Sequence, residues 1–570
     1  MSAFCDIALC NATYYPQYNR LNETAWQQSG WYWKSIGTKG GDYIHKYKNP
    51  DGELVIIGQL YEVVDMGKVF ERIRKYISKA SNAFEEPAGH YAIFYFDNNS
   101  KEYHVFTNRL GTYHVYYSSI DKVVSTYYLG LAKQASARKM DWQGIAGFFS
   151  NGFFPDDKTY LEGITILQPA SWYCFDESLT LMHHKRYWDW QFEAKASPVD
   201  EWCDALHHIL NDTITTAVKD KATALPLSGG LDSRTIAGVL TKIDTQYKSL
   251  WAYSYGYSTA SPEIKIGKQI VNRRNIRFDK YVVPDYLWKE MANITDSVEL
   301  FQYLTGTRQA YVREAIQTNA DVVIGGHWGD VWLDGMGMEA DGNYGQLFKK
   351  KIVKNGSVQL LSTICSHYLP DYKTYLDSYF DMHASKYAHI KDADFRMKIY
   401  KTDQWSFRWT VPSLRMYQAA AMPVLPFYDK RIVDLFMKIP SEVLKGRELQ
   451  IAYLKKYHPD LASIKWQEYD RNLYSYKGFN NRHIVYRSVN KLKRVLSGKP
   501  HISRNWEVCY LNENAKQNLH DSLNTTAIKS IVAANDLRKM LDDFYRNPNA
   551  ANGYAISMLH TFAQFVNTVL

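Results

Sequence analysis

The pattern of apolar and polar residues changes along the chain and divides it into two parts. The segment from Gly89 to Ser118 alternates apolar and polar side chains and contains turn-forming residues at two points, which is typical of antiparallel strands. Two further strand-like runs, Glu53 to Val64 and Ser171 to His184, bracket this segment. The N-terminal part is therefore predicted to be rich in strands.

From Cys203 onward, apolar residues recur mainly at helical spacing. Short β-branched or aromatic runs, such as Tyr247 to Tyr257 and Ala320 to Gly326, interrupt this pattern. Strands that alternate with helices predict βαβ units and a parallel sheet. The polar segment Ala194 to Pro198 separates the alternating pattern from the helical one. We therefore expect one domain over residues 1–195 and a second over 196–570, in which the pattern is nearly all helical from about Ala384.

Composition narrows the class of protein but not its partners. Of the 570 residues, 46% are hydrophobic and 22% charged, as in soluble globular proteins. A net charge of +9 is mild for this length and selects no partner, and we expect no nucleic acid. The six cysteines form no CxxC pair, which argues against a disulfide scaffold or a zinc site. No signal peptide or membrane span is recognisable, so we expect a cytoplasmic protein, with its oligomeric state left open.

The segment Leu225 to Leu240, LPLSGGLDSRTIAGVL, predicts an anion-binding turn. A buried strand is expected to end at Leu227 and a helix to begin near Asp232. Glycines between them would let backbone N–H groups approach phosphate oxygens at the helix N-terminus. The GxGxxG and GxxxxGK[ST] phosphate motifs are absent. Ser-Gly-Gly-x-Asp-Ser suits a pyrophosphate, with Asp232 suited to magnesium; the alternative is a tight turn without a ligand.

This loop resembles the pyrophosphatase loop of the N-type ATP pyrophosphatases, and its neighbours narrow the resemblance to the asparagine synthetase superfamily. Trp251 to Val271, Val322 to Gly335 and Met422 to Pro440 are similar to later landmarks of that family, in the same order. GHYAIFYFD, NRLGTYHVYYS and TYLEGITILQPASWYCF are similar to landmarks of its N-terminal domain. The resemblance covers about residues 50–470.

The resemblance implies a fold and a set of site residues. The fold would be an α+β N-terminal Ntn-hydrolase-like β-sandwich, followed by an α/β parallel-sheet ATP pyrophosphatase (adenine nucleotide α-hydrolase-like) domain with a helical C-terminal part. Magnesium would be held by Asp232 and Asp330, and Lys465 would be the catalytic cation over the departing pyrophosphate. The residues that would bind ATP are Leu227, Ser228, Gly229, Gly230, Asp232, Ser233, Tyr255, Gly325 and Gly326.

The N-terminal part departs from the glutamine-dependent members of the family. Those members carry Cys directly after the initiator Met, where this chain has Ser2, and Cys5 comes three residues too late. Ile57 stands where the family has a glutamine-binding Asn, and the expected Arg segment upstream is not recognisable. The chain thus resembles the glutaminase-deficient branch, which includes lasso-peptide macrocyclases and β-lactam synthetases, and we expect an inactive glutaminase domain.

Other departures lie in the second half. His327 stands where glutamine-dependent members usually carry Glu, and several lasso-peptide macrocyclases also have His there. With a pKa near neutrality, His327 could accept a proton from an attacking amine, or it could be a structural, hydrogen-bonded residue. Trp328 replaces a glycine and leaves the shape of its loop open. The remaining replaced positions are Val331, Met422 and Val424. The basic segment Arg482 to Arg504 is either a solvated face or a contact for an acidic partner or a membrane surface.

Together these observations predict an ATP-dependent, amide-bond-forming ligase. A substrate carboxylate would be activated as acyl-AMP with release of pyrophosphate, then coupled to an amine without glutamine hydrolysis, with ATP and Mg²⁺ required. The carboxylate could belong to a small molecule, a sugar acid of polysaccharide synthesis or a precursor peptide, as in a macrocyclase. Two alternatives stay open: an ammonia-using asparagine synthetase, and a non-catalytic ATP-binding scaffold or regulator.

Overall fold

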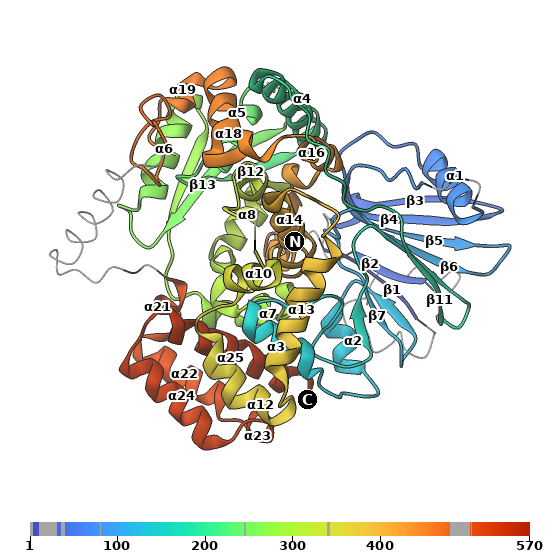
Figure 1. Cartoon of the computed structure of the whole chain (residues 1–570), viewed down its shortest axis with the longest axis vertical. Helices are drawn as coiled ribbons and strands as arrows, with labels where there is room; N and C mark the ends of the chain where they lie inside the picture. The colour runs from blue at the N-terminus through green and yellow to red at the C-terminus, as the bar shows by residue number, and fades with distance from the viewer. Residues whose placement is uncertain are drawn as a thin grey trace.

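The computed structural model describes residues 4–10, 31–35, 40–79, 81, 83–243, 247–338, 342–478, 502 and 504–570. Figure 1 shows the N-terminal strands on the right, the parallel sheet with its helices at the top and the C-terminal helices at the bottom. Ser2 and nearly all of the basic segment 482–504 lie outside the described residues.

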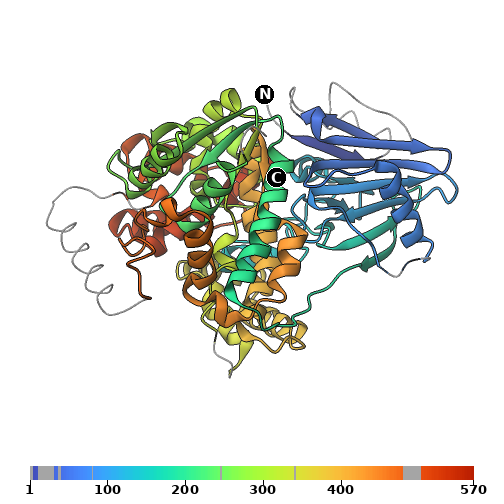
Figure 2. The ribbon, with the colours of Figure 1, turned by 90° about the horizontal axis from the view of Figure 1, so that it is seen from above.

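Two antiparallel sheets make up the N-terminal part, as the alternating pattern predicts (Figure 2). One sheet has the order β2 (Trp31–Ser35), β1 (Cys5–Leu9), β8 (Val123–Ser125), β7 (Tyr116–Ser118), β9 (Ile164–Ile166). The other has the order β11 (Leu181–Arg186), β10 (Ser171–Phe175), β6 (Tyr103–Thr107), β5 (Gly89–Asp97), β4 (Gly52–Leu60), β3 (Ile44–Asn49).

Alternate residues of each strand enter different hydrophobic cores, because successive side chains point to opposite faces of a sheet. In β4, Val55 and Ile57 pack between the two sheets, whereas Leu54 and Ile56 pack against helix α1 (Met66–Ile77). On the far side of the other sheet, Tyr116 packs with helices α2 (Tyr128–Gln134) and α3 (Trp142–Asn151). The N-terminal part is therefore a four-layer arrangement of helix, sheet, sheet and helices.

A five-stranded parallel sheet follows, as the alternation of strands and helices predicts. Its order is β14 (Arg277–Val282), β13 (Ser249–Gly256), β12 (Ala222–Pro226), β15 (Val322–Ile324), β16 (Met422–Val424), and every neighbouring pair is parallel. The chain moves from β12 outward through α5 (Leu231–Leu240) and α6 (Pro262–Arg274), then returns to β15 on the other side of β12. The strand order reverses between β12 and β15, and ligands of open α/β sheets bind in the crevice at such a point.

Helices complete the second part and surround the parallel sheet. Before the sheet's end they are α4 (Val199–Val218), α7 (Leu287–Val298), η4 (Leu304–Gly306), η5 (Arg308–Val312), α8 (Arg313–Asn319), α9 (Gly329–Trp332), α10 (Tyr344–Ile352), α11 (Ser357–Leu360), η6 (Leu361–Cys365), α12 (Ser366–Tyr368), α13 (Tyr372–Lys386), α14 (Ala393–Tyr400), η7 (Lys401–Thr410) and α15 (Val411–Gln418). After it come η8 (Pro426–Tyr428), α16 (Lys430–Phe436), α17 (Ser441–Leu444), η9 (Lys445–Arg447), α18 (Glu448–Tyr457), α19 (Pro459–Ala462), α21 (Asn505–Tyr510), α22 (Glu513–Leu523), α23 (Thr526–Lys529), α24 (Ala534–Arg546) and α25 (Ala550–Val569). The short η3 (Gly40–Tyr43) precedes β3.

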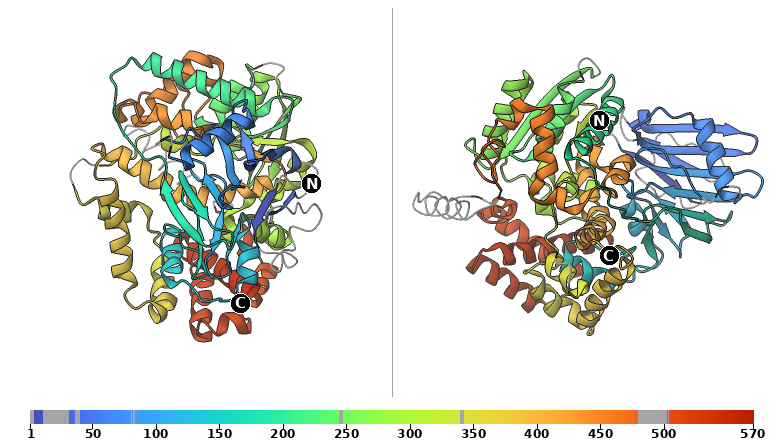
Figure 3. Two further views of the ribbon diagram at one scale, coloured as in Figure 1. Left: turned by 90° about the vertical axis from the view of Figure 1, so that its right-hand side faces the viewer. Right: turned by 45° about the horizontal axis from the view of Figure 1, so that its top comes forward.

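The N-terminal sheets and the C-terminal helices are packed together rather than joined by a bare linker. Phe149 of α3 contacts Phe562 of α25 with ring centroids 5.4 Å apart. The left view of Figure 3 shows the C-terminal helices below the N-terminal strands. Buried Arg415 of α15 pairs with Glu299 at 2.9 Å and lies 3.9 Å from Asp6 of β1. Removing one partner of a buried ion pair costs much free energy. Arg415, which lies beside both Glu299 and Asp6, therefore helps to hold the N-terminal part against α15.

Two expectations about the chain's class can be compared with the described residues. Five cysteines (Cys10, Cys174, Cys203, Cys365 and Cys509) are free and buried, as expected for a chain without a disulfide scaffold. Within the described part of the chain, every helix is too short or too polar to cross a membrane.

Candidate functional site

A cavity of about 410 Å³ opens where the strand order reverses, beyond the carboxyl ends of β12 and β15. Its size is typical of a small-molecule site. The predicted site residues that line it are Leu227, Ser228, Asp232, Ser233, Tyr255, Gly325, Gly326, His327 and Asp330. Gly229, Gly230 and Lys465 are not part of its wall.

The loop after β12 is held in shape by its own hydroxyl groups. The backbone N–H of Ser228 donates to Ser233 Oγ at 3.1 Å, and the N–H of Gly230 donates to Ser228 Oγ at 3.2 Å. Ser233 lies in the first turn of α5, so the loop leads directly onto a helix N-terminus. Because N–H groups and the helix dipole favour negative charge there, the loop suits a phosphate group.

The loop after β15 packs directly on the first loop, and its glycines make this possible. A Cβ atom at Gly326 would lie 2.7 Å from the carbonyl carbon of Asp232, and one at Gly329 would lie 3.0 Å from the carboxyl carbon of the same residue. A Cβ at Gly325 would lie 2.4 Å from His327 Nδ1. Larger residues at these positions would therefore force the two loops apart.

Two side chains, one from η9 and one from α18, donate hydrogen bonds to Asp232. Arg447 Nη1 donates to Asp232 Oδ1 at 2.8 Å, and Gln450 Nε2 donates to the same oxygen at 2.9 Å. Burial raises the pKa of Asp232 to about 6, with Arg447 lowering it and Asp330 raising it. The two carboxylates therefore repel each other across the loops, and Arg447 offsets part of this repulsion.

His327 lies between the second loop and α15. Its Nδ1 is buried and has no hydrogen-bond partner among the described residues, and its ring lies edge-on to Tyr417 at 5.8 Å. Burial lowers the pKa of His327 to about 4, with Asp330 opposing the shift. This pKa lies below the expected range near neutrality, because the cavity wall desolvates the ring. The imidazole is neutral at pH 7 and keeps a lone pair available.

The backbone of Trp328 lets the loop after β15 keep a shape that suits glycine. Its backbone adopts the left-handed conformation, with φ of 73°, which a glycine would adopt without strain. The indole is buried and donates from Nε1 to Thr402 Oγ1 at 3.1 Å. The bulky side chain is thereby directed into helix η7, and the loop keeps its close approach to Asp232 despite the replacement.

The ammonium group of Lys465 is not part of the cavity wall. Its side chain is 61% exposed, and Nζ pairs with Asp470 at 3.2 Å. The Lys465 backbone is nevertheless tied to α5, because Arg234 donates to its carbonyl oxygen at 2.8 Å. Beside it, the Gln467 N–H donates to the Gly229 carbonyl at 3.3 Å. The structure thus brings the Lys465 segment against the first loop but does not bring the ammonium into the wall.

One protein-family model matches the central part of the chain. Residues 205–456 match the asparagine synthase family model. This part of the chain is an asparagine synthase domain. It contains all of the cavity wall, and Lys465 follows it by a few residues. No curated protein matches the chain.

Solved structures add only distant likenesses. The chain is 13% identical to the U34-tRNA thiolase NcsA from Methanococcus maripaludis, over 59% of this chain and 87% of that one, with a TM-score of 0.22. It is 12% identical to NMN synthetase from Francisella tularensis, over 39% and 94%, with a TM-score of 0.20. It is 10% identical to glutamine phosphoribosylpyrophosphate amidotransferase from B. subtilis, over 49% and 85%, with a TM-score of 0.19.

Several residues of the cavity were not predicted from the sequence. Those in its wall are Glu263, Arg308, Lys401, Trp405, Trp409, Thr410 and Tyr417. Most of them lie on segments far from the glycine loops in the sequence, where no motif marks them. Arg447 and Gln450, which contact Asp232, lie on helices beyond β16. The one available signal was the spacing of Lys401, Trp405 and Trp409, each four residues apart.

The carboxylates of the asparagine synthase domain fit a magnesium ion. Asp232 and Asp330 come from two loops that touch, and each raises the local negative charge for the other. The hydrogen bonds from Arg447 and Gln450 both involve Oδ1 of Asp232. Magnesium is bound by one or two carboxylates together with substrate phosphates, so this donor set matches its chemistry.

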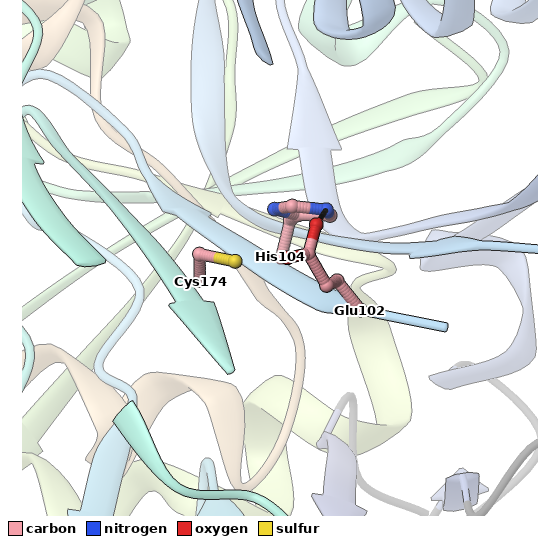
Figure 4. Close-up of side chains that lie close together, drawn as sticks. All are labelled: Glu102, His104 and Cys174. Carbon is pink, nitrogen blue, oxygen red and sulfur yellow. Dashed lines mark ion pairs between the residues drawn. The ribbon is translucent and has the colours of Figure 1, made fainter. Parts of the chain in front are cut away.

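A second polar cluster, Glu102, His104 and Cys174, lies on the N-terminal sheet, where β6 and β10 pair (Figure 4). Trp172 Nε1 donates to His104 Nδ1 at 3.1 Å, so the ring proton lies on Nε2, which is 3.8 Å from Glu102 Oε2. Burial raises the pKa of the Cys174 thiol to about 12. A metal ion needs an imidazole lone pair and a thiolate. Because Nε2 carries the proton and the thiol is not ionised, this cluster does not suit a metal ion.

Proposed function

We propose that the chain is an ATP-dependent ligase that forms an amide bond through an acyl-adenylate. The supporting observation is the meeting of two glycine loops and two carboxylates at the reversal point of the parallel sheet, within an asparagine synthase domain. This arrangement offers backbone N–H groups, a helix N-terminus and a magnesium site to one triphosphate.

In the first proposed step, a substrate carboxylate oxygen attacks the α-phosphorus of ATP. A bond from that oxygen to phosphorus forms, the bond to the β-phosphate bridging oxygen breaks, and pyrophosphate leaves. Ser228, Ser233 and the N-terminus of α5 would hold the departing pyrophosphate. Asp232 and Asp330 would hold magnesium, which supplies positive charge to the phosphates when bound.

Lys465 would add a second positive charge at the pyrophosphate. Its backbone is tied to α5, and its partner Asp470 lies on the surface, where a solvated ion pair contributes little. Exchanging Asp470 for a pyrophosphate oxygen would therefore cost little, while the fixed backbone limits how far the ammonium has to move.

In the second proposed step, an amine nitrogen attacks the acyl carbon. A carbon–nitrogen bond forms, the bond from the acyl carbon to the phosphate oxygen breaks, and AMP leaves. The neutral imidazole of His327, which lines the cavity, would accept the amine proton through Nε2, since Nδ1 is buried against Gly325 of the same loop. The negative phosphate of the bound acyl-adenylate would raise the pKa of His327 from about 4 toward a useful range.

We further propose that the N-terminal part is an Ntn-like domain that does not hydrolyse glutamine. Its two stacked antiparallel sheets, covered by helices, support the fold assignment. Ile57, at the position where the resemblance places an amide-binding Asn, is completely buried in the apolar core between the sheets. An apolar residue there offers no hydrogen bond to a glutamine amide.

The test of the ligase proposal is ATP–pyrophosphate exchange with labelled pyrophosphate and a panel of carboxylates. Exchange that depends on a carboxylate is expected, and aspartate with ammonium is included to detect an asparagine synthetase. ATP binding without exchange for every carboxylate, combined with normal biological function of Asp232→Ala and Lys465→Ala, would establish the scaffold alternative instead. Glutaminase activity that disappears in Ser2→Ala or Cys5→Ala would contradict the inactive N-terminal domain.

A further inference from the structure

One wall of the cavity is formed by a π-helix. Helix η7 runs from Lys401 to Thr410 and closes its hydrogen bonds over five residues, a wide turn that is rare and is often found at functional sites. Within it, Lys401, Trp405 and Trp409 are half-buried and line the cavity, whereas the other seven residues are buried. One face of η7 is thus turned to the cavity, and it carries one cation and two indoles.

Lys401 is a cation without a fixed counter-ion. Its Nζ lies 3.9 Å from Met336 Sδ and 5.2 Å from the ring centroid of Trp405, and no carboxylate of the described residues lies within ion-pair distance of it. Burial lowers the pKa of Lys401, with Asp330 opposing the shift and Lys351 adding to it. Because a partly buried charge is costly without a partner, this position favours an anionic ligand.

The two indoles form a corner beside that cation. Trp405 and Trp409 have ring centroids 6.1 Å apart and an interplanar angle of 87°. Trp405 is held from outside the cavity by Lys354, whose Nζ lies 4.2 Å from its ring, and by Phe153. Trp409 packs on Tyr303 with centroids 6.2 Å apart. The corner is therefore fixed before a ligand enters, which lowers the ordering cost of binding a flat group there.

The adenine of ATP is expected on a different wall. Tyr255 lies at the end of β13, on one side of β12, whereas η7 is joined to the loop after β15, on the other side, by the bond from Trp328 to Thr402. Helix η7 is thus adjacent to the loop after β15.

Resting on the function proposed above, we propose that η7 is the substrate subsite and selects a carboxylate carried directly on a ring or through one carbon atom. Lys401 pairs with the carboxylate, and the ring packs in the corner of Trp405 and Trp409. The separation of 5.2 Å between the ammonium and the Trp405 ring leaves room for an ion pair and a stacked ring joined by one or two bonds. Aromatic acids and pyranose acids share this chemistry.

Binding without ATP tests the subsite independently of catalysis. Saturation-transfer NMR and calorimetry on the full chain would compare phenylacetate and glucuronate with the open-chain acids succinate and aspartate. We expect the ring acids to bind at least tenfold more tightly, and the stronger of the two to identify the ring type. Trp409→Ala should weaken ring-acid binding about tenfold and leave open-chain acids unchanged. Lys401→Met should weaken both classes tenfold or more.

A matched control variant and a measurement of ATP affinity distinguish failure of the subsite proposal from failure of the ligase proposal. Trp142→Ala removes an indole that stacks on Tyr368 at 4.0 Å outside the cavity, and it should change none of these affinities. Equal binding of ring and open-chain acids to the unaltered protein, or a Trp409→Ala variant with unchanged ring-acid binding, would overturn the subsite. Loss of ATP affinity in Trp409→Ala would instead assign the corner to adenine and also overturn it. Failure of exchange with intact ring-acid binding would refute the ligase proposal alone.

Discussion

Two buried histidines in this chain show how the surrounding fold decides what a residue can do. His327 and His104 both have a pKa lowered to about 4 by burial. His104 lies within a sheet, where Trp172 donates to its Nδ1 and its other nitrogen faces Glu102. His327 lies at a loop of the parallel sheet and lines the cavity. In each ring one buried nitrogen, Nε2 of His104 and Nδ1 of His327, has no hydrogen-bond partner among the described residues.

The difference comes from the architecture of the two parts. In the N-terminal sandwich, strands alternate residues between filled cores, and His104 is enclosed there beside Trp172 and Glu102. At the edge of the parallel sheet, loops leave the strands where the strand order reverses, and polar groups from distant segments converge on an open crevice. His104 is thus closed off from any cavity of this site, whereas His327 lines one.

The test with the largest expected effect replaces one carboxylate by the matching amide in each of the two regions. Asp232→Asn should reduce ATP–pyrophosphate exchange by about a hundredfold to a thousandfold, because it removes a magnesium ligand and the partner of Arg447. Glu102→Gln, in the cluster on the N-terminal sheet, should leave exchange unchanged. Initial exchange rates at saturating ATP measure both; a comparable loss in Glu102→Gln would show that the two regions are not separated as described.

The histidines themselves give the next test. His327→Gln should slow amide formation by roughly a hundredfold while leaving pyrophosphate exchange nearly intact, because only the amine step needs a base. His104→Gln should leave both steps unchanged and destabilise the fold by about 1 kcal/mol, since it weakens the bond from Trp172. Single-turnover amide formation and urea unfolding measure these outcomes. Equal losses of exchange and amide formation in His327→Gln would exclude a role limited to the second step.

The pH dependence of Mg²⁺-ATP binding should follow Asp232. Its pKa of about 6 lies above the usual range, and the protonated carboxyl cannot bind the metal, so affinity should fall by up to tenfold per pH unit as the pH drops below about 6. Arg447→Met should move this midpoint to higher pH, because Arg447 lowers the pKa of Asp232. Calorimetric titration between pH 5 and 8 measures it, with Lys445→Met in the same turn as the control. A midpoint that stays in place would remove Asp232 as the titrating group.

The smallest expected effect concerns the bond between the second loop and η7. Trp328→Phe keeps an aromatic ring but removes the N–H that bonds to Thr402, and should destabilise the protein by about 1 kcal/mol. Thr402→Val should cost a similar amount, and the double variant should cost less than the sum if the two residues act through this bond. Urea unfolding of the three variants measures the coupling; strictly additive losses would show that the bond contributes nothing.

Much of the fold could be predicted from local pattern. The alternation in Gly89 to Ser118 predicted strands that the structure contains as β5, β6 and β7, and the βαβ texture predicted a parallel sheet. The glycine loops were found because close backbone approach requires glycine, and Gly326 and Gly329 do lie against Asp232. In contrast, Arg447 and Gln450 carry no local signal, because their role depends on where α18 and its preceding turn pack.

The sequence by itself predicted the strands and the glycine turn after β12, since these depend on the pattern along a single segment, and its resemblance to a family pointed to the loop after β15 and to Asp330. Only the tertiary structure decided three other properties. It lowered the pKa of His327 through burial, placed the ammonium of Lys465 on Asp470, and turned Lys401, Trp405 and Trp409 toward the cavity. Each of these depends on contacts between segments far apart in the chain, whose desolvation and charge no local pattern records.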